Sequence, residues 1–173
     1  MRNQPSDQQI LQERARRLAV RKSDQSPEGE SILAIEFLLL PEKYCIDSSC
    51  IAEVLPLKDI TRIPGTPSFV VGVMNVRGKI ISVIDLKSFL HLKEIGIMES
   101  NKVMVVKSQE MEFGILTDAI EGTRQIYLNS LIPPPVTING IGAEYIKGIT
   151  TDGRILLEAK TLLSNKSIKV MDQ

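Results

Sequence analysis

From residue 31 onward, the chain consists of short apolar runs separated by proline, glycine and other turn residues. Runs of this length, rich in β-branched residues, predict strands rather than helices. The predicted strands are 31–40, 43–47, 50–55, 70–76, 79–86, 101–107, 111–116, 145–150 and 154–158. Short helices are predicted near 86–92, near 128–132 and after Ala159. Many short strands with frequent turns favour a mainly β fold, either a barrel or a sandwich.

An internal repeat sharpens this prediction. Residues 44–53 resemble residues 113–121, and in both segments an aromatic residue precedes an isoleucine by seven positions. Residues 71–81 likewise resemble residues 147–156, with the glycines in the same order. We therefore predict two copies of a strand-rich unit, forming two small barrels side by side. The alternative is that short apolar β motifs match by chance.

The composition excludes much chemistry. Lysine and arginine number 21, as do aspartate and glutamate, so the formal net charge is zero and gives no general attraction for nucleic acid or an anionic membrane. His91 is the single histidine, and no Gly-x-Ser-x-Gly elbow or glycine-rich phosphate loop is present. Zinc needs about four ligands. We predict no catalytic residue, no metal site, no cofactor and no nucleic-acid partner.

The two cysteines allow one alternative to this exclusion. Cys45 and Cys50 are expected to be reduced, buried, apolar side chains, because the sequence carries no export signal. A cysteine-dependent enzyme is the competing hypothesis, although neither cysteine has a histidine nearby in the sequence.

Residues 1–30 differ from the rest of the chain. They are polar and charged, without the apolar core of a secretory signal, and a thin stripe of Leu11, Ala15 and Leu18 predicts a helix over about 7–22. This helix is either an extension or a segment that binds a groove on a partner. No apolar run approaches the ~20 residues of a spanning helix, so a cytoplasmic chain without membrane insertion is expected. We predict an extension over 1–30 and a folded domain over 31–173.

A polar tetrapeptide stands between two apolar strands, at residues 75–78. Gly78 suits a turn with positive φ, and Asn75 can accept a hydrogen bond from the local backbone. Arg77 would then project from a rigid hairpin and could bind a partner in bidentate fashion. The alternative is a surface arginine paired with Asp85 or Glu53. Glu53 itself lies among apolar neighbours, so it either faces water or pairs across an interface.

Several stretches carry a resemblance to a known family. They are 61–67 (TRIPGTP), 71–78 (VGVMNVRG), 83–86 (VIDL), 113–115, 133–135, 140–148 and 152–155. In this order they closely resemble the CheW family of bacterial chemotaxis coupling proteins, over about residues 31–165. The resemblance implies a mainly β fold of two packed five-stranded SH3-like β-barrels with short helices, and no catalysis. Residues 1–30 lie outside the CheW-like double-barrel domain.

The resemblance also implies a function. Family members are adaptors that join the cytoplasmic tip of methyl-accepting chemoreceptors to the regulatory domain of a CheA-type histidine kinase, in a two-component system beneath the membrane. A CheW-like adaptor of a non-chemotactic pathway, such as surface motility or gene regulation, is the alternative. The family's Asn-Leu-Arg-Gly turn matches residues 75–78, with Val76 in place of leucine. The implied partner-binding residues are Arg77, Glu53, Ile51, Gly72, Val73, Asn75 and Gly78.

Overall fold

The computed structural model describes residues 29–92, 101–135 and 142–168. The internal contacts divide the chain between Glu30 and Ser31, and the fold below is that of the second unit. The helix predicted over 7–22 lies outside the described residues.

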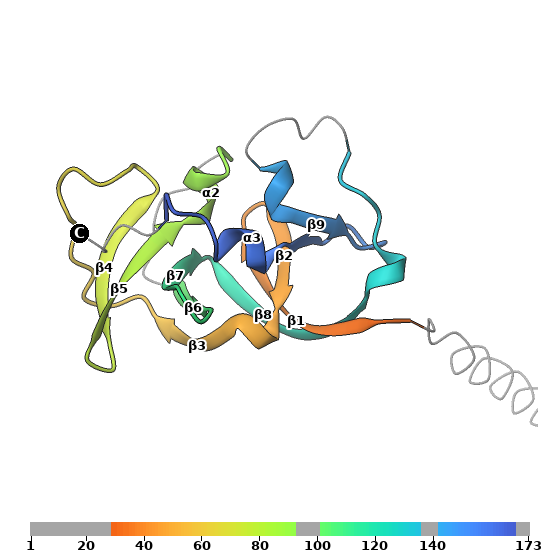
Figure 1. The fold of residues 1–173 in the computed structure, drawn as a ribbon, viewed down its shortest axis with the longest axis horizontal. Helices are drawn as coiled ribbons and strands as arrows, with labels where there is room; N and C mark the ends of the chain where they lie inside the picture. Colours follow the sequence, from red (N-terminus) through yellow and green to blue (C-terminus); the bar gives the residue numbers. More distant parts are fainter. Residues whose placement is uncertain (1–28, 93–100, 136–141, 169–173) are drawn as a thin grey trace, which may run out of the picture. The chain divides into compact units, whose positions relative to one another are not determined.

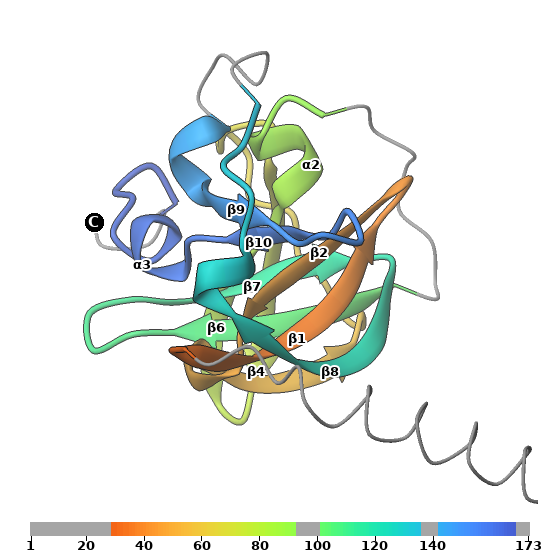
Figure 2. The ribbon, with the colours of Figure 1, turned by 90° about the vertical axis from the view of Figure 1, so that its right-hand side faces the viewer.

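Within those ranges, the chain forms two five-stranded sheets (Figures 1 and 2). The first has the order β8-β1-β2-β10-β9 and the second the order β3-β6-β7-β5-β4. The strands are β1 (Ser31–Leu39), β2 (Glu42–Asp47), β3 (Ile51–Pro56), β4 (Val70–Val76), β5 (Lys79–Asp85), β6 (Lys102–Lys107), β7 (Glu112–Thr117), β8 (Ala119–Tyr127), β9 (Ile146–Ile149) and β10 (Ile155–Leu157). The predicted fold class, mainly β with two five-stranded units, is confirmed.

The described helices are short. They are the α-helices α2 (Leu86–Phe89) and α3 (Ala159–Leu162) and the 3-10 helices η1 (Ser48–Cys50), η2 (Leu128–Ser130) and η3 (Ala143–Tyr145). The strand predicted over 79–86 ends at Asp85, because the Asp85 carboxylate accepts a hydrogen bond from the backbone N–H of Lys87 and so caps α2.

One long strand, β8, was not predicted from the sequence. β8 spans nine residues and pairs with β1 along its length, yet no strand is predicted there from the residue pattern. Its centre, residues 121–125, is polar, and only Ile126 is buried in the strand. The alternating apolar pattern that identifies strands is therefore absent. Pairing with β1 therefore determines the strand conformation of β8, which the sequence of β8 alone does not specify.

The sheet order supports the predicted duplication and corrects its geometry. Adding or subtracting five from each strand number converts the order of the first sheet into that of the second. The parallel pairs β2–β10 and β5–β7 correspond, as do two isolated bridges, Thr61 with Val73 and Ile132 with Ile149. However, neither sheet is one copy of the repeat. The chain leaves the first sheet after β2 and returns at β8, so each sheet contains strands from both halves.

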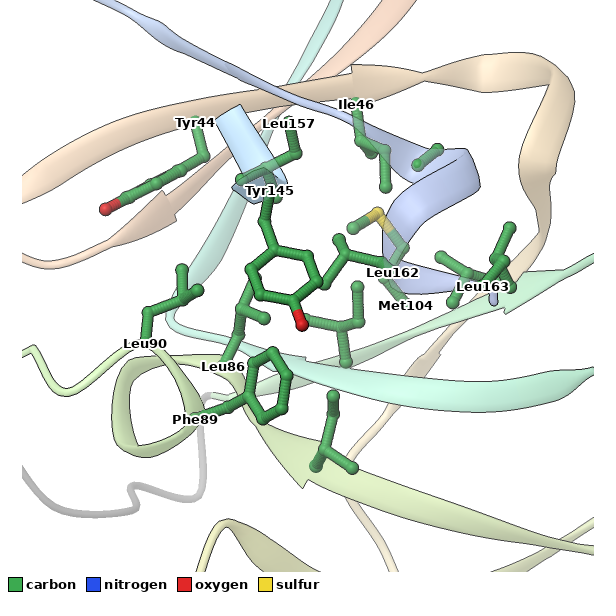
Figure 3. Packing of buried hydrophobic residues seen from close by; sticks show 14 of the residues in the cluster. Tyr44, Ile46, Leu86, Phe89, Leu90, Met104, Tyr145, Leu157, Leu162 and Leu163 are labelled. Atoms are coloured by element: carbon green, nitrogen blue, oxygen red, sulfur yellow. The ribbon is translucent and has the colours of Figure 1, made fainter. Parts of the chain in front are cut away.

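The largest apolar cluster takes side chains from both sheets, whereas two smaller clusters belong to one sheet each. In the large cluster, Phe37 and Tyr44 of the first sheet join Met104 and Ile115 of the second. Figure 3 shows the Tyr145 ring pointing toward Phe89, and the two ring centroids lie 5.2 Å apart in an edge-on arrangement. This shared apolar layer is the main attachment between the sheets.

A buried ion pair reinforces that attachment where the chain crosses between sheets. Asp118 lies between β7 and β8, and its carboxylate is 3.1 Å from the Lys87 ammonium on α2. The same carboxylate accepts hydrogen bonds from the backbone N–H of Leu40 (2.7 Å) and the side-chain amide of Asn101 (3.0 Å). The exposed fractions are 4% for Lys87 and 13% for Asp118. Buried charges require such partners.

Replacing Asp118 with alanine is expected to lower the free energy of unfolding by about 3–5 kcal/mol, because the Lys87 charge would remain buried without its partner. Urea denaturation measures the change. The matched control is Glu121→Ala, which removes the exposed pair with Lys43 and should change stability by about 1 kcal/mol or less. Equal effects of the two substitutions would contradict the role given to Asp118.

Candidate partner-binding site

The β4–β5 hairpin ends in a tight two-residue turn. Val76 pairs with Lys79, and the residues between them, Arg77 and Gly78, have φ values of 52° and 86°. Positive φ at both positions is the type I′ geometry, whose twist matches that of the flanking strands. The Asn75 side-chain oxygen accepts a hydrogen bond of 2.8 Å from the Gly78 N–H. The predicted local roles of Asn75 and Gly78 are therefore confirmed.

Arg77 lies at the tip of this hairpin and is held by Glu53 of β3. Its Nε lies 3.0 Å from Glu53 Oε1, and its Nη2 lies 3.1 Å from Oε2. The hydrogen bonds and the charge of Glu53 raise the pKa of Arg77. Of the two acids considered from the sequence, Glu53 is thus the partner, and Asp85 caps α2 instead.

The guanidinium remains open to a further partner. The Arg77 side chain is 81% exposed, whereas Glu53 is 22% exposed. Nη1 of Arg77 forms no hydrogen bond within the described part of the chain. The carboxylate therefore fixes one edge of the guanidinium and leaves the other edge able to bind an acidic or carbonyl group.

Gly72 and Val73 lie on the same strand, farther from the tip. A Cβ on Gly72 would stand 2.4 Å from the Thr61 carbonyl oxygen, so glycine is required by the close approach of the backbone. Val73 exchanges two backbone hydrogen bonds of 2.8 Å with Thr61. Local packing explains Gly72 without a partner. Ile51, at the start of β3, packs against the large shared cluster. The structure thus brings Arg77, Glu53, Asn75 and Gly78 together, and places the other three predicted residues elsewhere.

A groove lies between the two sheets, and its residues were not identified from the sequence. The groove is lined by Val54, Leu55, Pro56, Lys102, Asp118, Ala119 and Ile120. Val54 pairs with Met104, and directly paired residues share a face of the sheet. Because Met104 belongs to the shared cluster, the groove is the open rim of that cluster. The groove depends on β8, the strand that was not predicted, because β8 supplies Ala119 and Ile120 to its lining.

The corresponding hairpin in the other half, β9–β10, carries the opposite charge at its tip. Asp152 Oδ2 lies 2.5 Å from Arg124 Nη1 and also pairs with Arg154. A hydrogen bond from the Thr150 hydroxyl, together with the two guanidinium groups, lowers the pKa of Asp152 to about 2. Arg124 and Arg154 also pair with Glu36 at 2.6 Å. The Asp152 carboxylate is therefore paired with two arginines, whereas Arg77 is paired with a single carboxylate.

The remaining reactive residues are absent from the hairpin tip and from the lining of the groove. Cys45 and Cys50 are free thiols and are buried, as expected, and burial raises the pKa of each to about 11, which disfavours the nucleophilic thiolate. His91 is exposed and has a φ of 55° just after α2. Among the described residues, no cluster of three histidine, cysteine or acidic side chains could hold a metal. No helix in those ranges is long and apolar enough to cross a membrane.

Known proteins are similar to this chain in sequence. The family model described as the CheW-like domain matches residues 34–165. The chemotaxis protein CheW of Treponema pallidum (strain Nichols) is 29% identical over 156 residues, covering 86% of this chain and 92% of that protein. Protein FrzA of Myxococcus xanthus is 32% identical over 104 residues, covering 60% of this chain and 64% of that protein.

A solved structure agrees with the sequence comparison. The crystal structure of the scaffolding protein TtCheW from Thermoanaerobacter tengcongensis superposes with a TM-score of 0.70 at 30% identity, covering 82% of this chain and 99% of that chain. The double sheet and these relatives lead to one conclusion: the chain belongs to the CheW-like domain family, to which it is related through chemotaxis and scaffolding proteins.

Proposed function

We propose that this protein is a cytoplasmic adaptor that couples the cytoplasmic tip of methyl-accepting chemoreceptors to the regulatory domain of a CheA-type histidine kinase. The observation that carries the proposal is the presence of two different surfaces. One is the exposed guanidinium at the β4–β5 tip, and the other is the apolar groove at the rim of the shared cluster. An adaptor needs separate contacts for two partners, and these two surfaces differ in chemistry.

The hairpin tip suits a folded partner such as the kinase domain. The type I′ turn and the Glu53 ion pair hold Arg77 in place before binding, so little conformational entropy is lost when a partner contacts it. An arginine in a fixed orientation recognises a carboxylate or carbonyl group by bidentate hydrogen bonding. Asn75 and Gly78 support this arrangement within the turn, and Glu53 supports it from β3.

The groove suits a helical receptor tip. Its apolar side chains come from two sheets, and Val54 remains 38% exposed. An amphipathic helix can bury its apolar face in such a groove.

The adaptor would favour whichever kinase state it binds better, and a multivalent array would raise the effective concentration of each partner. Gene neighbourhood distinguishes a chemotactic pathway from surface motility or gene regulation.

Arg77→Ala is expected to weaken binding to a CheA-type regulatory domain at least about tenfold, because the oriented guanidinium is lost. Isothermal titration calorimetry measures the affinity. Lys79→Ala is the matched control, since Lys79 lies beside the turn, is 74% exposed and pairs with Glu112. Unchanged affinity for Arg77→Ala would remove Arg77 from the site. No complex of the unmodified protein up to about 50 µM would refute the kinase adaptor.

Val54→Asp is expected to weaken binding of a chemoreceptor tip fragment at least about tenfold and to leave kinase binding unchanged, because a charge enters the apolar groove. The two affinities are measured on the same preparation. Leu33→Asp is the control, since Leu33 is also an exposed aliphatic residue, at 54%, but does not line the groove. Equal loss with both variants would contradict the groove as the receptor site.

A further inference from the structure

We propose that Lys102 makes the groove selective for an amphipathic helix that carries an acidic residue beside its apolar stripe. This inference rests on the proposed receptor-binding role of the groove and specifies the chemistry of its occupant. It depends on two observations. The first is the charge of the residues that line the groove, and the second is the interruption of backbone pairing along the two edge strands beside it.

Among the described residues, the charges that line the groove leave Lys102 without a counter-charge. Asp118 and Lys102 both line the groove, but Asp118 is already bound by Lys87, by the Leu40 N–H and by Asn101. Within the described ranges, the Lys102 ammonium forms no ion pair or hydrogen bond. The apolar groove therefore presents one positive charge to whatever occupies it.

The register of β6 directs Lys102 toward the groove. Lys102 pairs with Pro56 on one side and with Thr117 on the other. Directly paired residues of antiparallel strands point to the same face, so Lys102 shares its face with Pro56, another lining residue. The Lys102 side chain is half-buried, so an ion pair formed there would be less screened than one in open water.

The bordering edges disfavour a strand as the occupant. β3 and β8 are edge strands of their sheets. Pro56 has no N–H to donate at the groove end of β3, and the β3–β6 pairing shifts register between Ile51 and Glu53. The β1–β8 pairing shifts register between Glu36 and Phe37, just beyond Ile120 of β8. Proline and bulges interrupt the row of backbone groups that an added strand requires. An occupant must therefore bind through side chains, as a helix does.

These constraints specify a helix as the occupant of the groove. A helix with apolar residues at positions i, i+3 or i+4, and i+7 would contact Val54, Pro56 and Ile120 along one face. Lys102 is the first residue of β6 and pairs with Pro56, the last residue of β3, so we place its counter-charge beside the apolar stripe of the helix. An ion pair of this kind contributes to partner discrimination and association rate as well as to affinity.

The test uses the full-length adaptor and a soluble fragment of the cytoplasmic tip of a methyl-accepting chemoreceptor from the same organism. Affinity is measured by calorimetry for the unmodified protein, Lys102→Met and Lys102→Glu. We expect a loss of about threefold for Lys102→Met and about tenfold for Lys102→Glu, the latter reduced by added salt. The control is Lys107→Glu, because Lys107 is an exposed lysine on the same strand, outside the groove, and should bind normally.

Charge exchange identifies the receptor residue. Each acidic residue beside the apolar stripe of the receptor fragment is replaced by lysine and paired with Lys102→Glu. One such exchange should restore binding, and its absence from every position would overturn the inference. Urea denaturation of the Lys102 variants separates a loss of affinity from a loss of folding.

The other outcomes are equally decisive. If Lys102→Glu binds normally while Val54→Asp does not, the groove remains the receptor site and the charge selectivity is wrong. Tighter binding by Lys102→Glu would indicate a basic occupant and overturn the inference. Protection of β3 or β8 backbone amides from hydrogen exchange on binding would indicate strand addition and overturn it also. If the unmodified protein binds no receptor fragment, the proposed function itself fails.

Discussion

The Asp118 carboxylate ties segments of the two sheets together beside their shared apolar cluster. It stands where the chain passes from β7 in the second sheet to β8 in the first, and it binds Lys87, the Leu40 N–H and Asn101 together. Because this carboxylate is fixed and neutralised from within, the adjoining rim of the shared apolar cluster stays open without an anionic charge of its own. Among the charged residues that line the groove, Asp118 is therefore satisfied by these contacts, whereas the Lys102 ammonium has no partner within the described ranges.

The two halves of the repeat keep the same framework and differ at their surfaces. The β4–β5 tip presents Arg77 to a carboxylate, whereas the β9–β10 tip presents Asp152 to two arginines. At a corresponding place in the sheets, Lys102 pairs with Pro56 and Leu33 pairs with Gln125. The shared strand order meets the demands of folding, so the charges at these positions are free to serve recognition. Such divergence identifies candidate partner surfaces better than any single residue does.

The sequence predicts those elements that depend only on interactions between neighbouring residues. The hairpin turn at residues 75–78 was predictable because asparagine and glycine have defined roles in turns, and Arg77 stood out between apolar strands. β8 was not predictable, since its polar centre is ordered by pairing with β1. The groove was missed for the same reason, because it needs β8 and the register that turns Val54 and Lys102 toward one face. Strand exchange between the repeats also depends on contacts that no short segment encodes.

One edge strand connects the two proposed partner surfaces. Successive side chains of β3 point to opposite faces, so Glu53 faces Arg77 while its neighbour Val54 faces the groove. The hairpin contact and the groove contact are therefore fixed to adjacent residues of the same strand. No conformational change is needed for such a scaffold to hold two partners at a set distance. Once both partners are bound, each is held at a high effective concentration relative to the other, which is the contribution of geometry to an adaptor.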